Sequence, residues 1–329
     1  MPQTGQSLQY LLAQFQEYAA NQQFNLQPPT LYDPIRYAMG SKGKAVRPLL
    51  LLLGASLGNA DLQKALPAAY AVELFHNFTL LHDDIMDEAP LRRGKPSVHT
   101  KFGVASAILA GDAMMIHTYG YLLDNYEGAT GSYLLKVFQA MAIGLCEGQQ
   151  RDMDMEVSEV STYTEYLEMI HGKTGVLITA CLEMGAFIGG LSPKQCETIR
   201  KVGDLAGRAF QIQDDVLDTF STSKQTGKSD YGDIVRGKQS APFLHALQSA
   251  SPTQQERLKE IYALTVEERS ILIPEVLSIM QDLGVEKSLA TQVEAASSEA
   301  NMLVESLQVD EEAKANLISF LDKLSVRRH

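Results

Sequence analysis

Several features are scarce or missing in this chain of 329 residues. It has no tryptophan and only three cysteines, and 40 acidic residues against 28 lysines and arginines leave a net charge of -12. This deficit of positive charge argues against nucleic acid as the main partner, because phosphate backbones attract basic surfaces. Cys146, Cys181 and Cys196 lack metal-ligand spacing and lie in apolar helical sequence. We therefore expect reduced, buried thiols, as in a cytosolic protein.

Linkers and targeting segments are also missing. No Gly/Ser-rich or Pro-rich linker and no low-complexity tract divides the chain, so we expect a single domain over residues 1–329, with ample chain to bury a core. Residues 1–25 are rich in glutamine and lack a basic segment followed by an apolar run, so no signal peptide is expected. No apolar segment reaches membrane-spanning length, and we expect a cytoplasmic protein without stable membrane insertion.

The short alternation of apolar and polar residues that is typical of strands is absent, whereas apolar residues recur at helical spacing. The fold is therefore predicted to be all-α, one large helical bundle whose functional residues come from facing helices. The region 241–326 contains no recognisable chemistry and is interpreted as scaffold. The other helices are expected at residues 7–20, 49–58, 62–86, 104–124, 131–157 and 162–189, and from Pro193 onward.

The most informative feature that is present is the pattern Asp-Asp-x-x-Asp, which occurs at Asp83–Asp87 and again at Asp214–Asp218. On a helix the first and fifth positions share a face, so each copy places two like charges together. One copy alone would be interpreted as a solvated acidic surface. Two copies inside apolar sequence favour Mg²⁺ sites, because unpaired charge there is costly and Mg²⁺ prefers oxygen ligands. Since Mg²⁺ is usually shared with substrate phosphates, a phosphorylated ligand is expected.

Basic residues gather in two loops near these motifs. Lys44 and Arg47 precede a predicted helix, whose first amides can help to bind an anion, although a solvated basic loop is an equally good interpretation. Arg92 and Arg93 follow the first acidic motif and can hold diphosphates by paired hydrogen bonds, or can pair with the aspartates. His76 lies two turns before Asp83 on nearly the same face, although a lone helical histidine is more often a core residue.

Two further segments interrupt helical sequence. In Gly172–Gly175 the flanking glycines predict a backbone bend that aims Lys173 and Thr174, and the spacing of a phosphate-binding P-loop is absent. The acidic run that includes Asp152 is interpreted as a polar helix end, while a metal pair of Asp152 with Glu156 stays open.

If the two acidic helices face each other across a cavity, its polar mouth would carry more positive charge than one phosphate needs, which suggests two diphosphate substrates. An apolar wall below it would suit a hydrocarbon tail. The cations concerned are Lys44, Arg47, Arg92, Arg93, Lys173, Lys228 and Lys238.

The order of these motifs resembles that of the trans-isoprenyl diphosphate synthases, also called polyprenyl synthetases. The resemblance spans roughly residues 40–240 and is specific, because both acidic motifs and the basic segments appear in the family's order. One segment departs from it: the family's Gly-Gly-Lys-Arg-x-Arg-Pro appears as Lys42–Pro48, without the first Gly and the first Arg. The motifs that match are Lys44-x-x-Arg47-Pro48, Asp83–Asp87, Arg92-Arg93-Gly94, Lys173-Thr174-Gly175, Gln211-x-x-Asp214–Asp218, Lys228 and Lys238.

The resemblance implies a role for each of these residues. Isopentenyl diphosphate would bind to Lys44, Arg47, His76 and Arg93. About three Mg²⁺ ions would bridge the allylic diphosphate to Asp83, Asp87 and Asp214, with Asp84, Asp215 and Asp218 as further candidate ligands. Arg92, Lys173, Gln211, Lys228 and Lys238 would assist. A homodimer is also implied.

The implied reaction needs no side-chain nucleophile. Mg²⁺ and the cations would stabilise the departing diphosphate, and oxygens of Lys173, Thr174 and Gln211 would face the allylic cation. The double bond of isopentenyl diphosphate would attack this cation, and the released diphosphate would remove the proton.

Product length is predicted from depth along the first acidic helix. Phe78 precedes Asp83 by five residues, about 7.5 Å along a helix, and Phe75 lies about 12 Å away. We expect Phe78 to limit the product to C15–C20, with geranylgeranyl diphosphate favoured because residues 76–82 resemble the family's geranylgeranyl-forming members. The alternative is that Phe78 only packs against another helix.

Other functions stay open. These are a longer-chain synthase, a class I terpene cyclase and a non-catalytic synthase subunit. Lys44, Arg47 and the Arg92–Arg93 pair argue against a cyclase, and two intact acidic motifs argue against an inactive subunit. The lack of an EF-hand's glycine-bearing loop in either motif argues against a Ca²⁺-binding structural protein.

Overall fold

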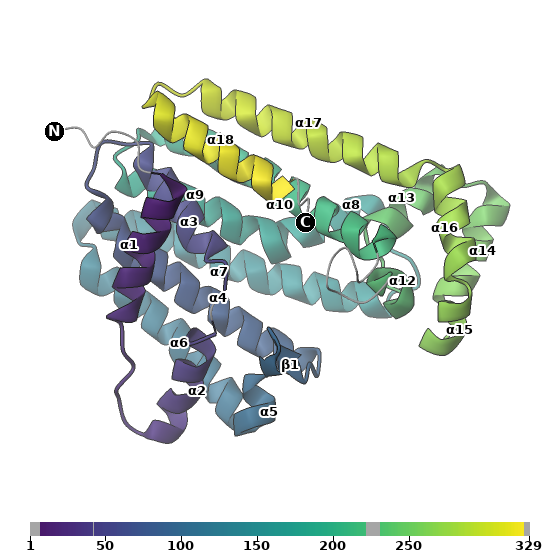
Figure 1. Cartoon of the computed structure of the whole chain (residues 1–329), viewed down its shortest axis with the longest axis horizontal. Helices are drawn as coiled ribbons and strands as arrows, with labels where there is room; N and C mark the ends of the chain where they lie inside the picture. Colours follow the sequence, from purple (N-terminus) through teal and green to yellow (C-terminus); the bar gives the residue numbers. More distant parts are fainter. Residues whose placement is uncertain (1–6, 42, 222–230, 326–329) are drawn as a thin grey trace. The chain divides into compact units, whose positions relative to one another are not determined.

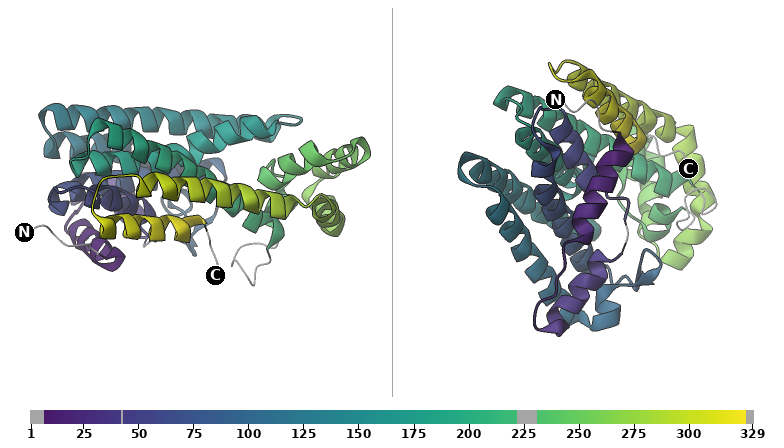
Figure 2. Two further views of the ribbon diagram at one scale, coloured as in Figure 1. Left: turned by 90° about the horizontal axis from the view of Figure 1, so that it is seen from above. Right: turned by 60° about the vertical axis from the view of Figure 1, so that its left-hand side comes forward.

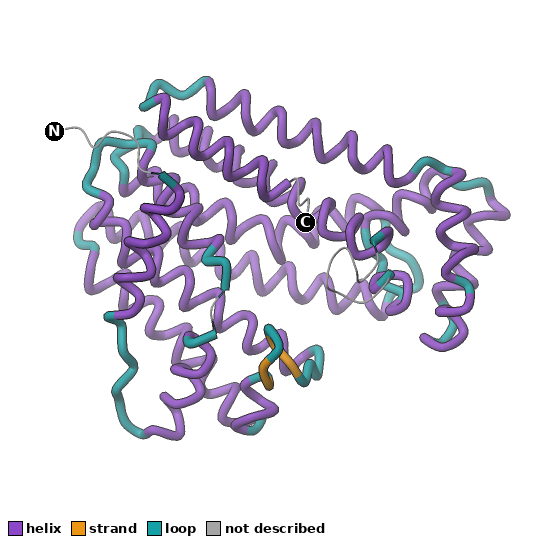
Figure 3. The backbone as a smooth tube through the Cα atoms, in the orientation of Figure 1, coloured by secondary structure: helices purple, strands orange, loops and turns teal. Residues whose placement is uncertain are grey.

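The computed structural model describes residues 7–41, 43–221 and 231–325 (Figure 1). Helices account for nearly all regular structure in these ranges, which confirms the all-α prediction (Figure 3). The strands in this part of the chain are β1 (Leu91–Arg92) and β2 (Lys95–Pro96), an antiparallel pair in the segment that the sequence predicted to be a loop.

The chain divides into two compact units, which we describe separately. The first comprises Met1–Ala140, Ala180–Ile199 and Gln308–Leu317, and the second comprises the remaining segments, Met141–Thr179, Arg200–Leu307 and Ile318–His329. The expectation of one domain stays a prediction.

The first unit is built around α4 (Leu66–Met86), which packs along α6 (Val104–Asn125) and against α3 (Val46–Ser56) (Figure 1). The predicted helix over 62–86 is confirmed, except that its first turn is the 3₁₀ segment η1 (Leu62–Ala65). The other helices that begin in this unit are α1 (Leu8–Ala20), α2 (Pro29–Met39), α5 (Val98–Phe102), α7 (Gly128–Val157), α10 (Pro193–Phe220) and α18 (Glu311–Ser325).

Glycines allow two backbones of this unit to touch. A Cβ atom on Gly54 would lie 2.5 Å from the carbonyl oxygen of Leu182, and one on Gly185 would lie 1.9 Å from that of Leu51. Both distances are shorter than any contact between non-bonded atoms, so only glycine fits at either position. The fully buried leucines of α3, Leu50 to Leu53, complete this packing.

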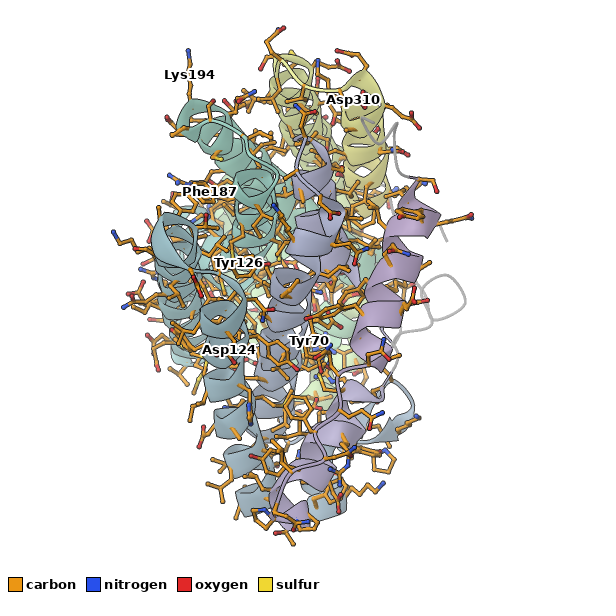
Figure 4. The ribbon with its side chains drawn as sticks, turned by 90° about the vertical axis from the view of Figure 1, so that its left-hand side faces the viewer. Tyr70, Asp124, Tyr126, Phe187, Lys194 and Asp310 are labelled. Carbon is orange, nitrogen blue, oxygen red and sulfur yellow. The ribbon has the colours of Figure 1, made fainter. Side chains whose placement is uncertain are left out.

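The hydroxyl of Tyr126 forms hydrogen bonds to the backbone at the start of α4. The Tyr126 hydroxyl donates to the carbonyl oxygen of Lys64 at 2.5 Å and accepts from the amide of Ala68 at 3.2 Å (Figure 4). Phe187, also labelled there, stacks on Tyr133 with ring centroids 3.8 Å apart. The start of the helix that carries the first acidic motif is therefore held by the Tyr126 hydroxyl.

The second unit has its core at Tyr166, Ile212, Phe243 and their neighbours. Its helices α14 (Pro252–Tyr262), α15 (Val266–Ile271) and α16 (Ile273–Asp282) pack beside one another (Figure 2). Its other elements are α8 (Tyr163–Ile170), η2 (His171–Gly175), α12 (Gly232–Arg236), α13 (Ala241–Ser249) and α17 (Val285–Glu305), and α9 (Val176–Ile188) begins in it.

Two expectations are corrected. Cys146 is exposed, because it lies on an outward face of α7, whereas Cys181 and Cys196 are buried as predicted. Helix α7 is also long and apolar enough to cross a membrane by length and composition, with 28% of its most apolar window buried. The expectation that no segment reaches this length is therefore wrong, although core helices of soluble proteins pass the same test.

Candidate active site

The three aspartates of the first motif, at the C-terminal end of α4, differ in burial. Asp83 is half-buried and Asp87, the residue that caps the helix, is exposed. Asp84 is only 2% exposed and accepts a hydrogen bond from Arg92 Nε at 2.8 Å, together with a second one from the same guanidinium. Arg92 thus forms an ion pair with Asp84. Pairing with an aspartate was one of the two roles that the sequence suggested for this arginine.

Arg93 contacts the basic loop that precedes α3. Its backbone is left-handed, with φ of 53°, and its guanidinium donates to the carbonyl oxygen of Ser41 at 2.6 Å. A Cβ atom on Gly43 would lie 2.7 Å from Arg93 Nη2, so this glycine leaves room for the guanidinium. Ala45, at the position where the family pattern has arginine, is also left-handed, with φ of 48°. Arg93 therefore contacts the segment that carries the exposed Lys44.

Near these cations α4 carries a row formed by the half-buried Glu73 and the buried His76 and Asn77. Burial raises the pKa of Glu73, and nearby Arg47 and Arg93 oppose this rise. Burial lowers the pKa of His76 well below its usual value, and the same two arginines lower it further. His76 is therefore neutral at pH 7 and can hydrogen-bond an anion without adding charge. Sequence reasoning found His76 but missed Glu73, whose only signal was an acid in apolar sequence.

A small pocket opens between α2, α4 and the hairpin in this unit. Asn77, Asp84, Arg92 and Arg93 line its polar side, and Leu80 and Leu81 line part of its apolar side. The predicted residues around the first motif are thus gathered at one end of α4.

In the second unit, the predicted bend between Gly172 and Gly175 is confirmed as the π-helix η2. A Cβ atom on Gly172 would lie 2.7 Å from Gly148 Cα, and one on Gly207 would lie 2.7 Å from Gly175 Cα. The glycines therefore let η2 fit between α7 and α10. Single π turns of this kind occur frequently at functional sites.

A chain of hydrogen bonds runs from η2 to the second acidic motif. Thr174 Oγ1 donates to Gln211 Oε1 at 2.9 Å, and Gln211 Nε2 donates to Asp215 Oδ1 at 2.9 Å. The other oxygen of Asp215 accepts from the Tyr166 hydroxyl at 2.8 Å and from the Ala241 amide at 3.1 Å. Asp215, at 2% exposed, is thus bonded within its own unit and orients Gln211 and Thr174.

The remaining cations of this unit lie among acids. Lys173 donates to Asp152, which gives Asp152 a partner other than Glu156. Although burial lowers the pKa of Lys238, nearby Asp215, Asp233 and Asp152 raise it above its usual value. Lys238 is therefore charged. A cavity of about 330 Å³ lies here, lined by Asp152, Met155, Glu156, Arg236, Gly237, Lys238 and Gln239.

Asp233 is a member of this cluster that sequence reasoning missed. It is 2% exposed, accepts from Arg236 at 2.9 Å, and burial raises its pKa to about 6, with Asp215 adding to the rise. Lys228 lies outside the described residues.

The described side chains do not form a complete metal site by themselves. Among the described residues, no group of three or more His, Cys, Asp or Glu side chains is arranged to hold a metal ion. Asp83 with Asp87, and the half-buried Asp214 with Asp218, are same-face carboxylate pairs on helices. Such pairs fit Mg²⁺, which commonly takes one or two carboxylates and completes its shell with water and phosphate.

Comparison with known proteins identifies the family. The model of the polyprenyl synthetase family matches residues 28–280, which is most of the chain.

The chain belongs to this family. As a polyprenyl synthetase it is a prenyltransferase of the trans-isoprenyl diphosphate synthase class, as the motif order predicted.

The sequence of this polyprenyl synthetase is similar to those of its relatives over most of the chain. It is 41% identical over 223 residues to the geranylgeranyl diphosphate synthase of Methanosarcina mazei, which is 67% of this chain and 68% of the relative. It is 35% identical over 307 residues to a short chain isoprenyl diphosphate synthase of Methanothermobacter thermautotrophicus, 93% of each chain. A crystal structure of a geranylgeranyl pyrophosphate synthase superimposes with a TM-score of 0.92 at 38% identity, over 98% of this chain and 100% of the other.

Proposed function

We propose that this polyprenyl synthetase condenses isopentenyl diphosphate with an allylic diphosphate to make geranylgeranyl diphosphate, with Mg²⁺ as cofactor. The observation that carries the proposal is that the aspartates within each acidic motif differ in burial and bonding. In both motifs the second aspartate is buried and bonded inside its own unit, while the first and fifth aspartates are more accessible carboxylates. The names of the relatives support the product.

Isopentenyl diphosphate is assigned to Lys44, Arg47, His76 and Arg93. The electrostatic effect of Arg47 and Arg93 on His76 supports this assignment, because it requires that these side chains lie near one another. Two guanidiniums and a lysine supply charge for a diphosphate, and the neutral imidazole supplies a hydrogen bond.

The allylic diphosphate is assigned to Asp83, Asp87 and Asp214 through Mg²⁺, with Asp218 as a further ligand and Arg92, Lys173, Lys228 and Lys238 as cations. When bound, Mg²⁺ neutralises the charge that develops as the allylic C–O bond breaks. Asp152 accepts a hydrogen bond from the Lys173 ammonium and so holds this positive charge in position to stabilise the departing diphosphate. The number of ions, about three, is part of this proposal.

The Thr174–Gln211 hydrogen bond supports a role next to the carbocation. Because the Thr174 hydroxyl proton is directed to Gln211, both lone pairs of Oγ1 point away from Gln211 and present negative charge there. Such an oriented dipole stabilises a cation without reacting with it. Isopentenyl diphosphate then attacks the cation, and the released diphosphate takes the proton.

Incubation of the purified protein with Mg²⁺, isopentenyl diphosphate and dimethylallyl, geranyl or farnesyl diphosphate in turn tests the function. We expect C20 product and its loss with EDTA. Turnover of an allylic diphosphate without isopentenyl diphosphate would instead indicate a terpene cyclase. Products beyond C20 would indicate a longer-chain synthase, and an inactive chain would indicate a non-catalytic subunit.

The limit on chain length is assigned to Phe78. Its half-buried ring lies 5.4 Å from that of Phe75 and 4.8 Å from that of His82, whereas Phe75 is 1% exposed and packs on Phe138 at 5.1 Å. Phe78 is thus the more accessible of the two rings, with Phe75 as a second layer behind it.

Phe78→Ala tests this assignment when product lengths are measured with farnesyl diphosphate as the starter. We expect products longer than C20, because the removed ring leaves space for a further isoprene unit. Phe187→Ala, which removes a ring from another helix, is the control and should keep C20. An unchanged product from Phe78→Ala would show that this ring only packs.

We further propose that the protein forms a homodimer through α6. Leu109, Ile116 and Leu123 are 60%, 71% and 57% exposed, and their seven-residue spacing places them on one helix face. A continuous apolar stripe of this kind favours a second copy of the same helix, which buries the stripe on both partners.

A further inference from the structure

Arg269, in the region that the sequence predicted to be scaffold, is 6% exposed. Its guanidinium donates to the carbonyl oxygens of Ile261 at 3.3 Å and Tyr262 at 3.0 Å, in the last turn of α14, and of Leu264 just after that helix. A fourth bond, of 2.8 Å, goes to the carbonyl oxygen of Val235 in α12. A buried arginine thus ties the end of α14 to the end of α12.

The end of α12 leads directly to Lys238. The amide of Lys238 donates to the carbonyl oxygen of Asp233 at 3.0 Å, and that of Gly237 donates to Ile234 at 3.0 Å. With Gly237 left-handed at φ of 70°, this is the Schellman pattern, which leaves the Val235 carbonyl for Arg269. The turn that fixes the Lys238 backbone is therefore completed by Arg269.

Arg269 packs so closely against Gly237 that no side chain fits at position 237. A Cβ atom on Gly237 would lie 2.3 Å from Arg269 Nη1. Arg236, Gly237 and Lys238 also line the 330 Å³ cavity that holds Asp152. Arg269 is thus in direct contact with Gly237, a residue of the cavity wall.

We propose that Arg269 is a positioning residue for the reaction, and that it acts by holding the α12 turn so that the Lys238 ammonium stays among Asp215, Asp233 and Asp152, where it meets the diphosphate. This inference rests on the proposed function. It assigns a role in substrate binding to a side chain that does not touch substrate.

The test compares the KM for the allylic diphosphate, kcat, and inhibition by inorganic pyrophosphate. Arg269→Lys keeps a cation but cannot reach all four carbonyls. It should raise the KM and the pyrophosphate inhibition constant about tenfold, with kcat changed less than about threefold. Arg257→Met is the control, because Arg257 bonds Glu275 and Glu260 between α14 and α16 without touching α12. It should leave the kinetics unchanged.

A double-mutant cycle separates positioning from general stability. If Arg269 acts through Lys238, then Arg269→Lys in a Lys238→Met background should raise the KM no further. Additive losses in the two backgrounds would overturn the proposal.

A second pair of variants leaves residue 269 as arginine. Gly237→Ala should reproduce the rise in KM, because its methyl group displaces the guanidinium. Gly284→Ala is its control, since Gly284 is also left-handed, at φ of 63°, but has nothing within 4 Å of an added Cβ atom. This pair decides the question if Arg269→Lys does not fold.

The two proposals fail in different ways. If the wild-type protein does not condense the two diphosphates, the proposed function is wrong. If the wild type is active and Arg269→Lys and Gly237→Ala behave like their controls, only the role of Arg269 is wrong.

Discussion

The second aspartate of each acidic motif shows how one residue type serves two purposes. Asp84 is held by Arg92, and Asp215 by Gln211, Tyr166 and the Ala241 amide. A buried carboxylate needs such donors, because an ionised group without them is very costly to desolvate. These two residues therefore orient their neighbours, while the first and fifth positions remain for Mg²⁺ in the proposed reaction.

Asp83→Asn and Asp84→Asn should consequently differ. We expect Asp83→Asn to raise the Mg²⁺ concentration for half-maximal activity by at least about tenfold. Asp84→Asn should lower the free energy of unfolding by about 1–3 kcal/mol, because it weakens a buried charged hydrogen bond. Magnesium titrations of activity and urea unfolding measure the two effects. Equal shifts in Mg²⁺ requirement would contradict the division.

Asp233 predicts a dependence of stability on pH. Its pKa in the folded protein, about 6, lies above its usual value of 3.8. The folded state therefore binds the proton more tightly, and this contribution to stability is full below about pH 4 and is lost as the pH rises through 6.

We expect the free energy of unfolding of the wild type, relative to Asp233→Asn, to fall by about 2 kcal/mol between pH 4 and pH 7. Urea unfolding with EDTA present measures it, since bound metal would change the charge nearby. A difference between the two proteins that does not vary with pH would show that Asp233 does not titrate in this range.

At the scale of the element, glycines decide where η2 can form. The backbones of η2, α7 and α10 touch at Gly148, Gly172, Gly175 and Gly207, and a side chain at Gly148, Gly172 or Gly207 would separate them. The π turn is thus a property of three segments together. It places Lys173 beside Asp152 and Thr174 beside Gln211.

Gly207→Ala should lower the free energy of unfolding by about 1–3 kcal/mol and reduce kcat, because its methyl group pushes against η2 and moves Thr174. Gly120→Ala, where an added Cβ atom meets nothing within 4 Å in this chain, should instead be neutral or stabilise the protein by about 0.5–1 kcal/mol. Both variants are made in the Ile116→Asp background, because Gly120 lies one turn from Ile116 on α6 and a dimer would cover it. Thermal unfolding and steady-state kinetics compare the two. A loss of the same size in both would rule out the close contact as the cause.

At the scale of the whole molecule, the α6 stripe predicts the oligomeric state. We expect sedimentation velocity to show a dimer for the wild type and a monomer for Ile116→Asp, because the charge would be buried without a partner in the dimer. Ile271→Asp is the control, since Ile271 is 78% exposed on α15, outside the stripe. A monomeric wild type, or a dimer that survives Ile116→Asp, would remove α6 as the interface.

The sequence by itself determined the features that depend on local spacing. Apolar periodicity placed the helices, paired glycines marked the bend at 172–175, and the repeated acidic motif with its ordered cations identified the family. These are readable because helix geometry relates residues three to seven apart in the chain.

Only the tertiary structure decided which residues of the same type have different roles in the proposed site. It separated Asp84 and Asp215 from the other aspartates, added Glu73 and Asp233 to the site, and linked Arg269 to the turn before Lys238. Each of these depends on burial and on partners distant in sequence, as far as 49 residues for Tyr166 and Asp215. No local pattern encodes such contacts, because they form only when distant segments pack together.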